Sequence, residues 1–180
     1  MIRQSWLIVA LSLFNAASLI AQAQPPVKLS LGFDNLQLGM SYAAIKTALT
    51  DKPGFQYRGE PDLSLSPGGE EKIIQTNGGF YIERAIFQFS NDQLFSIILD
   101  INPKAVDHFT LFSQFSAKYG DPQSLSPQQA VWDDGTVRIL LEQPATVKYL
   151  LIQTINDKLR AAGNAKAAQE EARETFLKKL

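Results

Sequence analysis

The sequence predicts an α+β domain in which an antiparallel sheet packs against helices on one of its faces. Residues 80–90 and 93–102 each alternate between apolar and polar side chains, the pattern of a half-buried strand. Apolar residues at helical spacing precede strands in both halves of the chain, at 41–49 and 104–119. Helices segregated to one face of an antiparallel sheet fit this order of elements.

The first half opens with an expected strand or strand-like arm at 29–38, where apolar residues partly alternate. Ser41 has a hydroxyl that can accept a backbone N–H of a first helical turn, so the sequence predicts a helix that starts there. Pro53-Gly54 ends this helix. Two short strands are expected after it, at 55–58 and 72–76.

The clearest signal is a hairpin in the middle of the chain. Its two alternating runs are separated only by Asn91 and Asp92, which suit a tight turn. The helix that follows should end at Tyr119, because Gly120 suits the position after a helix and Pro122 cannot continue one.

The second half repeats this order of elements. Strands are expected at 130–133, 136–142 and 146–154, with Asp134-Gly135 as the tight turn between the first two. The chain is therefore predicted to contain two weakly similar helix-plus-hairpin units. Their apolar faces should form one core, made by Phe87, Phe89, Phe95, Ile97, Leu99, Phe112, Phe115, Val137, Ile139 and Leu141.

The last segment, residues 156–180, is rich in Ala, Glu, Lys and Arg, which predicts a polar C-terminal helix. Its apolar stripe is thin, and Gly163-Asn164 weakens its middle. Two interpretations remain open, a solvated tail helix or a helix that docks on a partner.

The first 23 residues have the form of a secretory signal peptide. Arg3 precedes an apolar run at 6–14, and Ala21-Gln22-Ala23 supplies the small-x-small pattern of a cleavage site. The apolar run is short for a membrane span. We therefore expect a chain in three parts, which are a signal peptide at 1–23, a single α+β domain at 24–155 and a helical tail at 156–180.

Cysteine usage and charge narrow the class further. The chain has no cysteine, so disulfides and the lipobox cysteine of a lipoprotein are both missing. We expect a periplasmic or secreted protein of a bacterial envelope, with no stable membrane anchor after cleavage near Ala23. The formal net charge of −1 and the lack of a basic stripe argue against a nucleic-acid partner.

Few side chains offer catalytic chemistry. His108 is the only histidine, and the sequence shows no cluster at metal-ligand spacing, so no metal site and no cofactor are predicted. The acidic pairs Glu70-Glu71 and Asp133-Asp134 fall in a loop and a turn, whereas a glycosidase needs two acids that face each other across a cleft. No catalytic residue is predicted.

Candidate binding residues lie near the irregular segment 53–79, which is rich in Pro and Gly. Tyr57 and Arg58 combine an aromatic ring with a forked donor, types that are enriched at binding hot spots. Trp132, beside a tight turn, is a third candidate. For Tyr57 the alternative is packing under its own loop, and for Trp132 the alternative is a place in the core.

A resemblance supports the same class. Leu38-Gly39-Met40-Ser41 opens a helix, Lys118-Tyr119-Gly120-Asp121-Pro122 closes another, and Trp132 opens the next strand. In these phrases, over about residues 36–155, the chain resembles the outer-membrane assembly lipoproteins of the SmpA/OmlA type and the tandem-repeat β-lactamase inhibitor proteins. It looks still more like uncharacterised periplasmic proteins. The resemblance implies structural residues only, and the chain lacks both the acylated cysteine and the inhibitors' disulfides.

The expected function is that of an exported, soluble, non-catalytic protein that binds an unidentified envelope component, as an interaction or inhibitor-like module. Two alternatives remain. A small-ligand carrier in the periplasm requires a large apolar cavity between helix and sheet. A carboxylate-dependent hydrolase requires a pocket with facing acids whose pKa values are raised.

Overall fold

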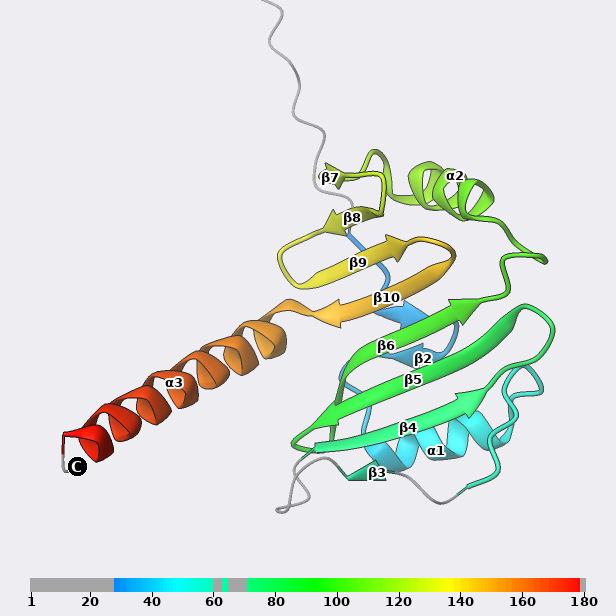
Figure 1. Cartoon of the computed structure of the whole chain (residues 1–180). Coiled ribbons are helices and arrows are strands. Elements are labelled where there is room, and N and C mark those ends of the chain that lie inside the picture. Colours follow the sequence, from blue (N-terminus) through cyan, green and yellow to red (C-terminus); the bar gives the residue numbers. More distant parts are fainter. Residues whose placement is uncertain (1–27, 60–62, 65–70, 179–180) are drawn as a thin grey trace, which may run out of the picture.

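The computed structural model describes residues 28–59, 63–64 and 71–178. The expected signal peptide and the tip of the 53–79 segment lie outside these residues. The fold is α+β, as predicted, with one antiparallel sheet in the order β3-β4-β5-β6-β10-β9-β8-β7 and a small β1–β2 sheet (Figure 1). The strands of the large sheet are β3 (Leu63–Ser64), β4 (Glu71–Asn77), β5 (Ile82–Ser90), β6 (Gln93–Ile101), β7 (Ser124–Leu125), β8 (Gln129–Asp133), β9 (Val137–Glu142) and β10 (Thr146–Leu151).

The order of the strands confirms two similar units. Each unit runs through a helix, a short strand and three longer strands, and the last strands of the units, β6 and β10, pair at the centre of the sheet. In that central pair Ile97 lies opposite Tyr149 and Leu99 opposite Val147. The units therefore share one continuous core across their junction.

The N-terminal arm is not the single strand that was expected at 29–38. It folds into a hairpin of β1 (Gly32–Phe33) and β2 (Leu36–Gln37), with Asp34 in the left-handed region at φ 53°. Glycine is required at position 32, because a Cβ there would lie 2.2 Å from the Leu36 carbonyl oxygen and 3.0 Å from Ile97 Cδ1. The hairpin thus lies directly on the sheet.

Helix α1 (Tyr42–Thr50) begins where the sequence predicts. The Ser41 hydroxyl accepts the N–H of Ala44 at 3.2 Å, and Ile45 and Leu49 are buried. The strand expected at 55–58 is only an isolated bridge between Phe55 and Gly78, because the surrounding Pro and Gly residues interrupt regular pairing. The expected strand at 72–76 is confirmed as β4.

The central hairpin is confirmed, with one correction. Asn91 and Asp92 both have positive φ, 50° and 59°, as a type I′ turn requires. Gln88 pairs with Ser96 and Phe89 with Leu94, so Phe95 is the extra residue of a β-bulge. Leu94 therefore takes the core place expected for Phe95, which lies outside the core cluster.

Helix α2 (His108–Tyr119) starts later than the expected residue 104. Asp107 caps it by accepting the Thr110 N–H at 2.9 Å, and that bond lowers the pKa of the Asp107 carboxyl. Its end is as predicted, because Gly120 has φ 80° and donates its N–H to the Ser116 carbonyl. Phe109, one of the apolar residues at helical spacing in the predicted helix, is 76% exposed.

The C-terminal helix α3 (Ile152–Leu177) begins four residues before the expected start at 156 and shortens the strand predicted at 146–154. Ile152 donates its N–H to the Thr136 carbonyl, which fixes the point where strand becomes helix. None of the α3 residues is buried, and Figure 1 shows the helix extending away from the sheet. Within the described part of the chain, no helix has both the length and the apolar character needed to cross a membrane.

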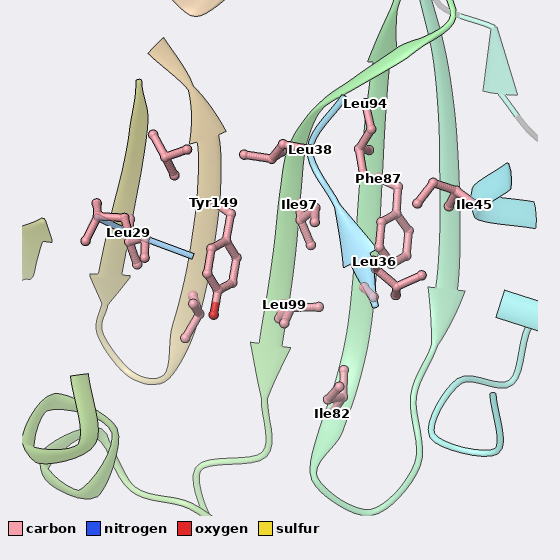
Figure 2. Close-up of a cluster of buried hydrophobic side chains, with 14 of the residues drawn as sticks. Leu29, Leu36, Leu38, Ile45, Ile82, Phe87, Leu94, Ile97, Leu99 and Tyr149 are labelled. Atoms are coloured by element: carbon pink, nitrogen blue, oxygen red, sulfur yellow. The ribbon is translucent and has the colours of Figure 1, made fainter. Parts of the chain in front are cut away.

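The core lies on one face of the sheet, under the β1–β2 hairpin and helices α1 and α2. Figure 2 shows Leu36 and Leu38 from the hairpin segment standing over Phe87 and Ile97 of the sheet. Eight of the ten predicted core residues are buried, Phe95 among them although it lies outside the cluster, while Phe112 and Phe115 are half-buried against the core.

Candidate functional site

An apolar pocket of about 450 Å³ opens at the end of the sheet where β5 begins and β6 ends. Four segments meet there: the β1–β2 turn, the loop after α1, the β4–β5 turn and the start of α2. Its lining is formed by Phe33, Asp34, Lys52, Pro53, Gly54, Phe55, Gly79, Phe80, Tyr81, Ile82, Ile101, Val106 and Leu111. We call this the apolar pocket.

Two aromatic side chains from the β4–β5 turn border the apolar pocket and remain open to solvent. Phe80 is 72% exposed and Tyr81 is 62% exposed, and their rings pack edge to face with centroids 5.1 Å apart. Adjacent large aromatics that stay exposed leave apolar surface in water, which is unfavourable in the free protein. The solvent exposure of Phe80 and Tyr81 therefore indicates a candidate binding surface in this region.

The turn that carries these rings is held in place by hydrogen bonds. Asn102 donates its backbone N–H to the Tyr81 carbonyl at 2.9 Å and its side-chain amide to the Phe80 carbonyl at 3.2 Å. Gly79 donates its N–H to the Gly54 carbonyl at 2.9 Å. The exposed rings thus stand on an anchored backbone rather than on a free loop.

Another part of the lining is aromatic and continues into the core. Phe33 and Phe55 pack edge to face at 6.3 Å, and Phe55 packs in the same way on Phe87 at 6.0 Å. At the border of the pocket, the Lys52 ammonium pairs with the Asp34 carboxylate. The two charges compensate each other, so the pocket is apolar inside with a neutral ion pair at its edge.

The three binding residues predicted from the sequence do not come together. Tyr57 is half-buried against the core, and its hydroxyl is buried without a hydrogen-bond partner among the described residues. Arg58 is exposed. Trp132 is fully buried, and the rings of Phe112 and Phe115 both pack on it. Its indole N–H donates to the Gly120 carbonyl at 2.9 Å. Trp132 is therefore a core residue, which was the alternative to its role as a binding residue.

The segment 53–79 nevertheless contributes to the apolar pocket through its two ends, with Pro53 to Phe55 on one side and Gly79 beside it. Sequence reasoning missed Phe80 and Tyr81, which were assigned to the alternating run 80–90. The sequence does contain a signal for them. Two adjacent large aromatic residues after Gly78-Gly79 do not fit the alternation of apolar and polar side chains expected for a strand.

The carboxylates of Asp133 and Asp134 stabilise the β8–β9 turn. Asp133 accepts from Arg138 at 2.7 Å, and Asp134 accepts the N–H groups of Thr136 and Val137 at 2.9 and 2.8 Å. Burial would raise the pKa of the Asp134 carboxyl, but its hydrogen bonds to backbone N–H groups outweigh burial and lower that pKa. In the part of the chain that the structure describes, no group of three acidic or histidine side chains is placed to hold a metal ion.

The fold and the pocket define an α+β protein of two helix-plus-hairpin units with an aromatic-rimmed pocket at one end of the sheet. A family model described as the TP0088 domain matches residues 31–161, so the chain belongs to this bacterial family. The match runs from the N-terminal arm into α3 and includes both units. No curated protein and no solved structure matches the chain.

Proposed function

We propose that this chain is an exported, non-catalytic protein of the bacterial envelope that binds an apolar segment of another envelope protein in the apolar pocket. The observation that carries the proposal is the pair Phe80 and Tyr81, exposed on a hydrogen-bonded turn at the edge of that pocket. Binding would cover their rings and place an apolar group of the partner against Phe33 and Phe55.

The rigidity of the turn supports a binding role. Single exposed apolar residues are common on protein surfaces and need no explanation. Binding energy, however, tends to concentrate in a few aromatic side chains beside well-packed pockets. Because the Phe80 and Tyr81 backbone is already fixed by Asn102 and Gly54, little conformational entropy would be lost on binding.

A non-catalytic role is supported by the way the acidic side chains are distributed. Among the residues that the structure describes, four cavities are each lined by a single carboxylate, from Asp34, Glu71 or Asp134. Hydrolysis by paired acids needs two carboxylates around one substrate. The binding role therefore fits the arrangement better than the carboxylate-dependent hydrolase.

Export is the second part of the proposal, and it rests on the signal-peptide pattern of residues 1–23. Mass spectrometry of the protein from its native host should find a mature N-terminus near Gln24 and no lipid. A retained Met1, or a protein confined to the cytosol, would contradict it.

A small-ligand carrier is the second candidate, and the volume of the apolar pocket favours it. Ligand pockets in proteins typically measure 300–1,000 Å³, and the apolar pocket falls in this range at about 450 Å³. A carrier would enclose its ligand, whereas a protein-binding module would leave Phe80 and Tyr81 to contact the partner's surface.

Photocrosslinking separates the two candidates. A photoreactive amino acid placed at Tyr81 in the native host should yield a discrete crosslinked protein, and the further substitution Val106→Trp, which fills the pocket wall, should abolish it. The same photoreactive residue at Phe109, which is exposed at 76% but does not line the pocket, is the matched control. Equal crosslinking at both positions, or none at Tyr81, would contradict a protein partner. A crosslinked small molecule would favour the carrier.

A further inference from the structure

A second cavity, of about 470 Å³, lies between the β1–β2 hairpin and the C-terminal half of α2. It differs from the apolar pocket in its chemistry, because hydroxyl and ammonium groups share its lining with aromatic rings. The lining residues are Ser30, Gly32, Phe33, Asp34, Gln114, Phe115, Lys118, Tyr119 and Tyr149. We call this the tyrosine pocket.

The most unusual group in the tyrosine pocket is the hydroxyl of Tyr149. Its ring stands in the core at 6% exposure, opposite Ile97 and Ile139 on the neighbouring strands (Figure 2). The hydroxyl of a tyrosine whose ring is buried usually finds a hydrogen-bond partner. Tyr149 Oη makes no hydrogen bond to the described residues and is not one of their fully buried polar atoms, so it is open to the tyrosine pocket that Tyr149 lines.

The surroundings of Tyr149 favour a hydrogen-bond acceptor as the group that its hydroxyl would contact in the tyrosine pocket. Burial, together with the neighbouring Tyr119, raises the pKa of the Tyr149 phenol, so its hydroxyl remains protonated and able to donate at neutral pH. Tyr119 is itself 7% exposed and lines the same cavity. Two phenol hydroxyls can therefore donate toward a ligand in the tyrosine pocket.

The balance of charges favours an anionic acceptor. The Lys118 ammonium lies 4.9 Å from the centroid of the Tyr119 ring and lines the pocket. Asp34 is the one carboxylate among the described lining residues, and it is already paired with Lys52. The positive charge of Lys118 is thus not offset by a paired acid within the lining.

We propose that the tyrosine pocket binds a small molecule with a carboxylate and a flat apolar body. The carboxylate accepts hydrogen bonds from the hydroxyls of Tyr149 and Tyr119 and faces the Lys118 ammonium. The apolar body lies against the rings of Phe33 and Phe115, which form the remaining large surfaces of the lining. The tyrosine pocket shares Phe33 and Asp34 with the apolar pocket, but Tyr149, Tyr119 and Lys118 line the tyrosine pocket alone. The proposal does not depend on the function proposed for the apolar pocket.

Calorimetric titration of the protein with 2-naphthoate tests this site, because the probe has a carboxylate on a flat ring system that the cavity can hold. Saturable binding is expected for the wild type. Tyr149→Phe, which removes only the hydroxyl, and Lys118→Gln should each weaken binding about tenfold. The uncharged analogue 2-naphthamide should bind at least about tenfold more weakly than the acid.

Two control variants locate the probe. Tyr81→Phe and Phe80→Ser change the apolar pocket only, and both should bind 2-naphthoate within about twofold of the wild type. Thermal melts of every variant by circular dichroism check that the fold is kept. The proposal is overturned if the wild type shows no saturable binding up to about 10 mM probe, or if Tyr149→Phe binds as tightly as the wild type. Equal binding of acid and amide also overturns it. These outcomes leave the photocrosslinking test at Tyr81 unaffected.

Discussion

The carboxylate of Asp134 accepts the backbone N–H of Leu29 at 2.9 Å, across 105 residues of sequence. The same carboxylate accepts the N–H groups of Thr136 and Val137 in the β8–β9 turn. One acidic side chain therefore ties the N-terminal arm to the second unit, just before that arm forms the β1–β2 hairpin. The hairpin lines both the apolar pocket and the tyrosine pocket, so this bond helps to position both.

We expect Asp134→Ala to destabilise the protein by about 1–3 kcal/mol, because three backbone donors lose a charged acceptor. The free energy of unfolding from urea titration at pH 7 measures the loss. Asp121→Ala is the matched control, an exposed acidic residue for which we expect a change within about 0.5 kcal/mol. A loss for Asp134→Ala no larger than for the control would show that the arm is not held by this carboxylate.

The same carboxylate predicts a pH dependence. The pKa of Asp134 is lowered in the folded protein from its ordinary value of 3.8. The stabilisation is therefore fully present above this ordinary value and is lost as the pH falls through the lower folded pKa. The difference in unfolding free energy between wild type and Asp134→Ala should be constant above about pH 5 and shrink below about pH 4. A difference that grows on acidification would contradict the assignment.

Helix α2 offers a matched pair of phenylalanines three residues apart. Phe112 is half-buried and its ring lies 6.0 Å from the Trp132 ring, whereas Phe109 is 76% exposed. Phe112→Ala should cost about 2–4 kcal/mol, because it leaves a void beside Trp132, and Phe109→Ala less than about 0.5 kcal/mol. Urea titrations of both variants measure this contrast, and equal losses would show that α2 does not pack as described.

The sequence predicts most of the fold because alternation and capping are local signals. Ser41, Gly120 and the Asn91-Asp92 turn all take the predicted places, since each is set by the chemistry of one or two residues. The prediction that Phe95 belongs to the core cluster was wrong, and the local pattern of apolar residues could not have shown why. A bulge depends on how β6 pairs with β5, and it gives that place to Leu94.

The candidate sites were harder to predict than the fold. The apolar pocket joins residues from the β1–β2 turn, the loop after α1, the β4–β5 turn and α2, which are distant in sequence. Tyr149 falls on the core-facing side of the alternating pattern of β10. That pattern predicts a buried ring, but it does not predict whether the tyrosine hydroxyl has a hydrogen-bond partner. Trp132 was a binding candidate by residue type alone, and its burial depends on tertiary contacts with Phe112 and Phe115.

The two interpretations left open for the C-terminal helix differ in what its removal should do. Lys158 pairs with Glu71 of β4, and its ammonium lies 5.0 Å from the centroid of the Phe95 ring. Beyond this point the described residues of α3 are exposed. The part of α3 before residue 160 is therefore the part that the sheet contacts.

We expect a chain that ends at Lys166 to keep its stability within about 0.5 kcal/mol, because the described residues that it lacks, 167–178, are all exposed. A chain that ends at Asn156 should lose about 1 kcal/mol or more, because Phe95, only 8% exposed in the full chain, is uncovered when Lys158 is removed. Urea titrations of the two truncated chains and the parent give this comparison. If the Lys166 chain also yields the crosslink at Tyr81, the distal half of α3 is a solvated tail. If that crosslink disappears while stability is unchanged, the distal half of α3 contacts the partner.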